Sequence, residues 1–76
     1  MSKYTKLLDG CTLMDKVEGE TGYNYYGYVR TGTSGEWVIM RENTAGTQYR
    51  FAIGGSGYST SWTNRGSIGY KIPTDA

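Results

Sequence analysis

The sequence predicts a small all-β protein, a single-domain antiparallel meander of four or five strands. Two segments rich in aromatic and β-branched residues lie between Glu36 and Ile53, and the turn sequence at 43–46, Asn-Thr-Ala-Gly, separates them. A third segment of the same kind, residues 23–30, precedes them. Because a chain of 76 residues can bury only a small core, we expect the sheet to be barrel-like or to be completed by oligomerisation.

The least regular part of the chain is residues 1–22, predicted to be an N-terminal arm or edge strand with a loop, ahead of an antiparallel β domain at 23–73. Large apolar residues alternate poorly over 3–8, so this stretch fits either an edge strand or an arm that reaches a neighbour. Residues 9–22 are predicted to be a loop with at most one helical turn, because the glycines at 19 and 22 leave a helix no length to propagate.

Residues 23–30, Tyr-Asn-Tyr-Tyr-Gly-Tyr-Val-Arg, are predicted to form a strand that pairs with the first strand of the hairpin. We expect Arg30 to lie opposite Glu36. The facing pairs are then Val29 with Trp37, Gly27 with Ile39 and Tyr25 with Arg41. Gly27 would leave room for the bulk of Ile39 or of an aromatic ring.

The hairpin at residues 36–53 has two candidate registers. A three-residue loop with a left-handed Gly46 pairs Arg41 with Tyr49, Ile39 with Phe51 and Trp37 with Ile53. A four-residue loop shifts the register by one and gathers Val38, Met40, Tyr49 and Phe51 on one face. We prefer the first register because it stacks three large cross-strand pairs on one face.

The preferred register divides the side chains of the three strands between two faces. The expected core face consists of Val29, Trp37, Ile39, Tyr49, Phe51 and Ile53. The expected reverse face consists of Tyr26, Tyr28, Val38, Met40, Arg50 and Ala52. The reverse face is too apolar and aromatic for a surface that meets only water, which indicates a contact with another molecule.

After the hairpin, residues 54–57, Gly-Gly-Ser-Gly, are predicted to be a plain connection. They do not fit a phosphate-binding loop, because no Lys-Ser/Thr pair follows and no long helix begins there. Residues 62–65 are predicted to be a turn or single helical turn, with Thr60 or Ser61 as its cap. Residues 67–72 alternate Ile68, Tyr70 and Ile72 with polar or small residues, the pattern of a half-buried strand that Pro73 ends.

Composition excludes several classes of function. Eight basic and seven acidic residues give a net charge of +1, which argues against a nucleic-acid or membrane partner. The N-terminus has no apolar run of the length of a signal peptide, so we expect a soluble protein made in a cytoplasm. Cys11 is the single cysteine and there is no histidine, so we expect no disulfide, no metal site and no cofactor.

The residues also indicate that the protein is not an enzyme. Cys11 has no base partner in the sequence and is expected to be a small buried or half-buried side chain. The carboxylates at 9, 15, 18 and 20 lie in a stretch where charges usually face solvent. No catalytic residue is therefore predicted.

Five motifs follow one another over roughly residues 21–72. They are Tyr25-Tyr26-Gly27-Tyr28, Glu36-Trp37-Val38-Ile39, Tyr49-Arg50-Phe51-Ala52-Ile53-Gly54, Tyr58 with Trp62-Thr63-Asn64-Arg65, and Ser67-Ile68-Gly69-Tyr70. This order resembles a group of short phage-encoded all-β proteins, which show a Tyr-Gly strand, a Trp-x-Ile strand, a glycine-ended strand, a Trp-x-x-Arg turn and a Ser-Leu-x-Tyr strand. This chain departs from that pattern at Ile68, where leucine is usual, and at Gly66, where alanine is usual.

The resemblance implies a virion accessory protein that decorates a capsid, sits at a head–tail junction or belongs to a tail or fibre. Such a protein would be made in the host cytoplasm, reside in the virion and act by protein–protein contact. Its partners would be other virion proteins and copies of itself. We expect the contact surface to be formed by Tyr26, Tyr28, Val38, Met40 and Arg50.

Two other functions fit the same residues. The first is a module that binds a glycan or a small ligand near the glycine-rich connection, through Tyr58, Trp62, Asn64, Arg65 and Tyr70. The second is a phage inhibitor that occupies a host protein, which shares every feature of a virion component except the identity of its partner.

Overall fold

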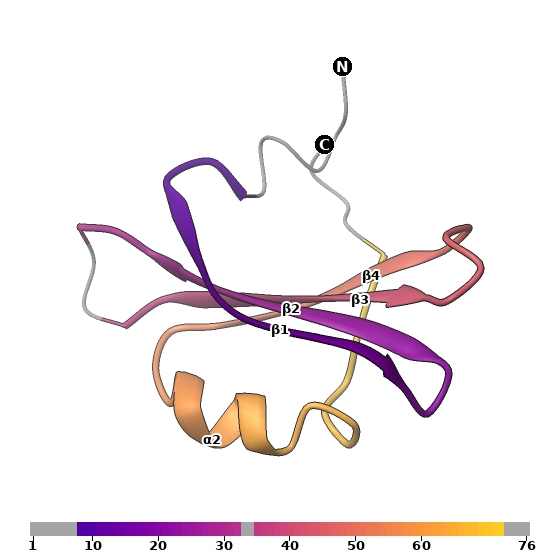
Figure 1. Cartoon of the computed structure of the whole chain (residues 1–76). Coiled ribbons are helices and arrows are strands. Elements are labelled where there is room, and N and C mark those ends of the chain that lie inside the picture. The colour runs from indigo at the N-terminus through magenta and orange to yellow at the C-terminus, as the bar shows by residue number, and fades with distance from the viewer. Residues whose placement is uncertain (1–7, 33–34, 73–76) are drawn as a thin grey trace.

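A computed structural model of the chain describes residues 8–32 and 35–72 (Figure 1). These residues form one antiparallel four-stranded sheet in the order β1-β2-β3-β4, a meander that is not closed into a barrel. The elements are β1 Cys11–Glu20, β2 Tyr23–Arg30, β3 Trp37–Asn43, β4 Tyr49–Gly54 and a short helix, α2 Tyr58–Thr63. The predicted all-β class is confirmed. Within the described ranges, no helix has both the length and the apolar character needed to span a bilayer.

The sheet has two broad faces, and α2 lies against one of them (Figure 1). We call this the helix face and the opposite one the far face. Side chains alternate between the faces along each strand. β2 and β3 pair as the sequence predicts, with Val29 opposite Trp37 and Gly27 opposite Ile39. The amide of Arg30 donates to the carbonyl of Glu36 over 2.9 Å and fixes this register next to the connection.

The preferred register of the β3–β4 hairpin is wrong by one residue. Trp37 lies opposite Gly54 rather than Ile53, and the same shift runs along the whole ladder. The second register, with a four-residue loop, is the one observed. The ring of Trp37 covers Gly54 so closely that a Cβ atom there would clash with it, so glycine permits this pairing and Ile53 would not.

The loop at the other end of this hairpin also explains the one-residue shift in register. The Asn43 side-chain oxygen accepts hydrogen bonds from the amides of Thr47 and Gln48 at 2.9 and 3.0 Å. Its side-chain nitrogen also donates to the Thr47 hydroxyl at 2.9 Å. Asparagine thus stabilises a loop over residues 44–47 by satisfying backbone groups that a three-residue loop would not present. Gly46 is left-handed, with a φ of 74°, as predicted.

The shift exchanges the faces of the β4 side chains. Val29, Trp37 and Ile39 lie on the helix face as predicted, and Ala52 and Arg50 join them there. The predicted core residues Tyr49, Phe51 and Ile53 lie instead on the far face, beside Tyr26, Tyr28, Val38 and Met40. Both faces contain buried residues, since Ile39 is 0% exposed on one and Val38 is 1% exposed on the other.

The prediction of a loop over residues 9–22 is wrong, because Cys11–Glu20 form the edge strand β1. The ladder with β2 is irregular between Leu13 and Asp15 and again between Val17 and Glu20. These irregularities break the alternation of side chains that would have revealed the strand in the sequence. Among the described residues, the sheet therefore begins at Cys11. The arm or edge strand predicted at 3–8 falls, apart from Leu8, outside the described residues.

The core of the helix face is aromatic. Its buried members are Tyr25, Trp37, Ile39 and Ala52, and partly buried side chains pack against them: Val17, Tyr23, Val29, Tyr58, Trp62, Ile68 and Tyr70. Gly27 lies beneath α2, where a Cβ atom would clash with the Tyr58 hydroxyl and the Trp62 ring. The room predicted above Gly27 is thus taken by aromatic rings of the helix.

The helix begins earlier than the turn predicted at residues 62–65. Gly57 precedes α2 with a left-handed φ of 74°, and no side chain caps the first turn. The predicted caps Thr60 and Ser61 therefore lie within the helix. The glycine supplies a backbone conformation that other residues rarely adopt, and the helix can start directly after it.

The strand predicted over residues 67–72 is also wrong, because only Lys71 pairs with the sheet. The amides of Phe51 and Lys71 each donate to the carbonyl of the other at 2.8 Å. Ile68 and Tyr70 are half-buried against the helix-face core, as the alternation predicted, while Ile72 is exposed. Pro73, the predicted end of the strand, lies outside the described residues.

Candidate functional site

The five residues predicted to form a contact surface are divided by the register shift. Tyr26, Tyr28, Val38 and Met40 share the far face, whereas Arg50 lies on the helix face. Val38 is buried, and it therefore supports the face rather than offering surface. The two tyrosines and the methionine are half-buried.

One row of apolar side chains crosses the far face from edge to edge. It consists of Leu13, Tyr28, Val38 and Ile53, each directly opposite the next in the successive ladders. We call it the apolar row. Its two ends are open, because Leu13 is 47% and Ile53 is 63% exposed. The sequence did not point to Leu13, since its strand was not recognised.

A polar network lies on the same face around the Glu42 carboxylate. The carboxylate accepts hydrogen bonds from the Asn24 side-chain amide at 3.3 Å and from the hydroxyls of Tyr26 and Tyr49 at 3.1 and 2.9 Å. Burial alone would raise the pKa of Glu42, but these three hydrogen bonds outweigh it and lower the pKa below its ordinary value. The network gives the far face a polar margin beside its apolar row.

The predicted ligand set lies on α2 and the segment after it. The rings of Tyr58 and Trp62 stack with their centroids 6.2 Å apart, and the guanidinium carbon of Arg65 lies 4.6 Å from the Trp62 ring. The Tyr58 hydroxyl donates to the Asp15 carboxylate at 2.6 Å, and burial followed by this hydrogen bond raises the pKa of Tyr58. These rings build the helix-face core, so they do not form an open platform for a sugar.

The other two residues of the predicted ligand set, Asn64 and Tyr70, lie outside the stack of Tyr58, Trp62 and Arg65. Asn64 is exposed at the end of the helix, where its side chain donates to the Thr60 carbonyl at 3.1 Å. Tyr70 is half-buried and donates its hydroxyl to the Arg65 carbonyl at 2.9 Å. Burial is the main cause of the raised pKa of Tyr70.

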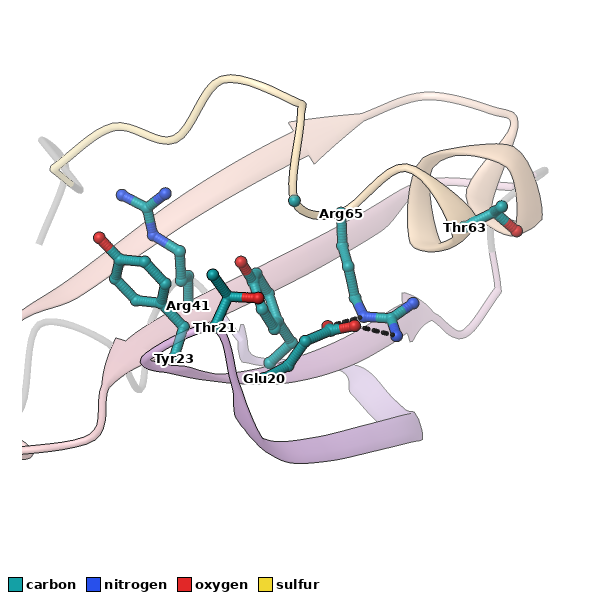
Figure 2. A pocket seen from close by; sticks show the side chains of 8 residues that line it. Glu20, Thr21, Tyr23, Arg41, Thr63 and Arg65 are labelled. Carbon is teal, nitrogen blue, oxygen red and sulfur yellow. Dashed lines mark hydrogen bonds and ion pairs between the residues drawn. The ribbon is translucent and has the colours of Figure 1, made fainter.

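A pocket of about 220 Å³ opens on the helix face where the β1–β2 turn meets the segment after α2. Its lining consists of Glu20, Thr21, Tyr23, Tyr25, Arg41, Thr63, Arg65 and Gly66. Figure 2 shows the Arg65 guanidinium joined to Glu20, while the Arg41 guanidinium lies away from that pair and beside Tyr23. Burial is the main cause of the raised pKa of Tyr25, and the charge of Arg41 opposes it.

The two arginines of the pocket are held differently. Arg65 donates to both carboxylate oxygens of Glu20, at 2.8 and 3.2 Å, and to the Trp62 carbonyl at 2.8 Å. The guanidinium carbon of Arg41 instead lies 4.5 Å from the ring centroid of Tyr23 and 4.5 Å from that of Tyr70. Arg65 is thus neutralised, whereas Arg41 is held by the faces of aromatic rings.

The pocket was not predicted from the sequence. Glu20, Thr21 and Tyr23 come together because a two-residue turn joins β1 to β2, with φ of 52° at Thr21 and 86° at Gly22. A Thr-Gly pair between two strands is the signal that could have predicted it.

The structure shows no constellation for metal chemistry in the part of the chain it describes. No three side chains among His, Cys, Asp and Glu of residues 8–32 and 35–72 gather closely enough to hold a metal ion. Cys11 is half-buried, as predicted.

Comparison with protein-family models, with curated proteins and with solved structures finds nothing that matches this chain. Two surfaces of the molecule bear on its function, the far face with its apolar row and the pocket on the helix face.

Proposed function

We propose that the protein is an accessory structural component of a bacteriophage virion that acts by protein–protein contact through the far face. The observation that carries the proposal is the apolar row, whose ends Leu13 and Ile53 are exposed on the margins of this face. The half-buried Tyr26, Tyr28 and Met40 lie between those ends. From here on, the contact surface means Leu13, Tyr26, Tyr28, Met40 and Ile53, which replace the set expected from the sequence. The phage assignment derives from the motif order described above.

The composition of the contact surface is that of an interface rather than of a ligand site. Tyrosine and methionine are enriched at the centres of protein interfaces, and polar groups surround them. Here the margin carries the Glu42 network and the ion pair of Arg30 with Glu36, 3.1 Å long. Both signs of charge are thus present, and the net charge of +1 does not keep copies of the chain apart.

The dimensions of the molecule suit one such contact. The chain is a slab of 33 × 31 × 18 Å with 4647 Å² of accessible surface. A stable protein interface buries roughly 800 Å² on each partner, which one broad face of this slab can supply. We infer that the first partner is another copy of the chain, seated on the same face.

The test replaces the exposed ends of the apolar row by charge. The double variant Leu13→Lys, Ile53→Lys should keep the circular dichroism of the parent, because both side chains are exposed. We expect the double variant to be a monomer by light scattering and the parent to be an oligomer of 8.4 kDa chains. Ile72→Lys is the control, because Ile72 is 59% exposed but lies outside the row.

Quantitative mass spectrometry of purified particles tests the virion role itself. We expect the parent and Ile72→Lys to be present in many copies and the double variant to be lost. Equal incorporation of the double variant would contradict the contact surface. Absence of the parent chain from particles would contradict the virion role. If the parent is a monomer in solution and is still incorporated, its partner on the far face is another virion protein and not a second copy of the chain.

A further inference from the structure

Among the described residues, the helix face carries two arginines, Arg41 and Arg50, that form no ion pair with a carboxylate. Arg41 and Arg50 lie directly opposite each other on β3 and β4. Arg65 has its carboxylate in Glu20, but none of the described carboxylates forms an ion pair with Arg41 or Arg50. Like charges that face each other across a sheet destabilise it. An anion bound beside Arg41 would remove this repulsion.

Arg41 is also prepared to receive an anion. The rings of Tyr23 and Tyr70 contact its guanidinium group, and such contacts use the flat face of the group. The N–H groups lie at the edge of that plane, and no acceptor among the described residues takes a hydrogen bond from them. The aromatic contacts thus hold a fork of donors in place at the pocket.

We propose that this pocket binds a carboxylate group, which Arg41 receives through paired N–H···O hydrogen bonds. A planar carboxylate matches the guanidinium fork in geometry. Glu20 also lines the pocket, and although Arg65 neutralises it, a singly charged ligand suits this lining better than a doubly charged phosphate. A volume of about 220 Å³ holds a carboxylate with a few attached carbon atoms.

The turn that borders the pocket supports a binding role. Thr21 lines the pocket and has a φ of 52°, a left-handed conformation that is unfavourable for a β-branched residue. Turns of this kind favour Asn-Gly. Backbone strain of this sort is concentrated at functional sites, and here it brings a threonine hydroxyl to the pocket wall.

The carboxylate has two sources that share this chemistry, a small free molecule and an acidic side chain of a polypeptide. Both present the same two oxygens to Arg41. The site lies on the helix face and does not depend on the contact surface of the far face, so either proposal can fail without the other.

Nuclear magnetic resonance titration of the ¹⁵N-labelled chain at constant ionic strength tests the site. The probes are acetate, the blocked peptide N-acetyl-Gly-Glu-Gly-amide, its glutamine counterpart and inorganic phosphate. We expect saturable shifts of the amides around Thr21 and Arg41 with a carboxylate probe, and none with the glutamine peptide. Arg41→Gln should weaken binding about 10- to 100-fold, the loss expected for a charge-assisted pair.

Two further variants test whether binding depends on the guanidinium group of Arg41 and not on positive charge in general. Arg41→Lys keeps the charge without the fork and should bind more weakly than the parent. Lys16→Gln removes one positive charge from the exposed side of β1 and should bind as the parent does. Circular dichroism of each variant establishes that it is folded.

Each outcome decides the proposal. Arg41-dependent binding of acetate alone would support the site and assign it to small free carboxylates, and Arg41-dependent binding of the glutamyl peptide alone would support it and assign it to a polypeptide. No saturable shift, phosphate binding as tight as that of the carboxylates, or equal weakening by Lys16→Gln would overturn it.

Discussion

The two faces of the sheet are completed in different ways. On the helix face, the chain supplies its own cover, because the rings of α2 close over Gly27 and Ile39 is fully buried. On the far face, the apolar row has a buried centre but exposed ends, at Leu13 and Ile53. The same kind of side chain thus supports folding on one face and offers surface on the other. Variants matched between the faces test this difference.

The largest difference is expected between two isoleucines. Ile39→Ala should lower the free energy of unfolding by about 2–5 kcal/mol, because it leaves a cavity in the core. Ile53→Ala removes the same atoms from a position that is exposed in the single chain, and at a protein concentration where the parent is monomeric it should change this free energy by less than about 0.5 kcal/mol. Urea unfolding followed by circular dichroism measures both. If Ile39→Ala does not fold, Ile39→Val, with an expected loss of about 0.5–1.5 kcal/mol, takes its place.

Equal losses in the two isoleucine variants would mean that the faces contribute alike and that the distinction between them is wrong. A larger loss at Ile53 would reverse the assignment of the core.

A smaller effect is expected from the cover of the helix face. Gly27→Ala places a methyl group against Tyr58 and Trp62 and should cost about 1–3 kcal/mol, since the helix has to move outward. Gly55→Ala is the matched control, because a Cβ atom at Gly55 meets nothing within 4 Å. The two variants should differ in their urea midpoints. Coincident midpoints would show that α2 does not pack over Gly27.

The smallest effect concerns the polar margin of the far face and depends on pH. The folded state lowers the pKa of Glu42 below its ordinary 4.5, so the carboxylate stabilises the fold above that pH, and this stability is lost as the pH falls through the folded value. Glu42→Gln should therefore be less stable than the parent by about 1 kcal/mol at pH 7, and the difference should shrink below pH 4.5.

Urea unfolding at pH 7 and at pH 3 measures this difference. Glu18→Gln, which breaks only an exposed ion pair with Lys16, is the control and should stay within about 0.5 kcal/mol at both values. A gap between Glu42→Gln and the parent that stays constant with pH would show that the three hydrogen bonds do not act on the carboxylate.

The sequence was sufficient for the strands with regular alternation and insufficient where side-chain hydrogen bonds or irregular pairing decided the structure. β2 and its register with β3 were predictable because aromatic residues and Arg30 opposite Glu36 agree on one pairing. The β3–β4 register depends on Asn43, whose side chain selects the longer loop, and periodicity cannot report that. β1 was hidden because its two irregularities remove the alternation on which a strand is recognised.

The candidate sites follow the same division. Tyr26, Tyr28 and Met40 were placed on one face from sequence, because that placement needs only the alternation within β2 and β3 and their correct register. Arg50 was misplaced by the hairpin shift. The pocket could not be predicted, since it requires the β1–β2 turn to meet the segment after α2, a contact between Glu20 and Arg65 that no local pattern encodes.

The bridge between Phe51 and Lys71 has a consequence for the behaviour of the protein when it is concentrated. An uncovered strand edge can recruit strands of other molecules and lead to fibrils. Here the middle of the β4 edge already has both its amide and its carbonyl bonded to Lys71, and β1 is irregular and charged along the opposite edge. Crowded copies would therefore meet through side chains, and the fold would resist amyloid-like aggregation at high local concentration.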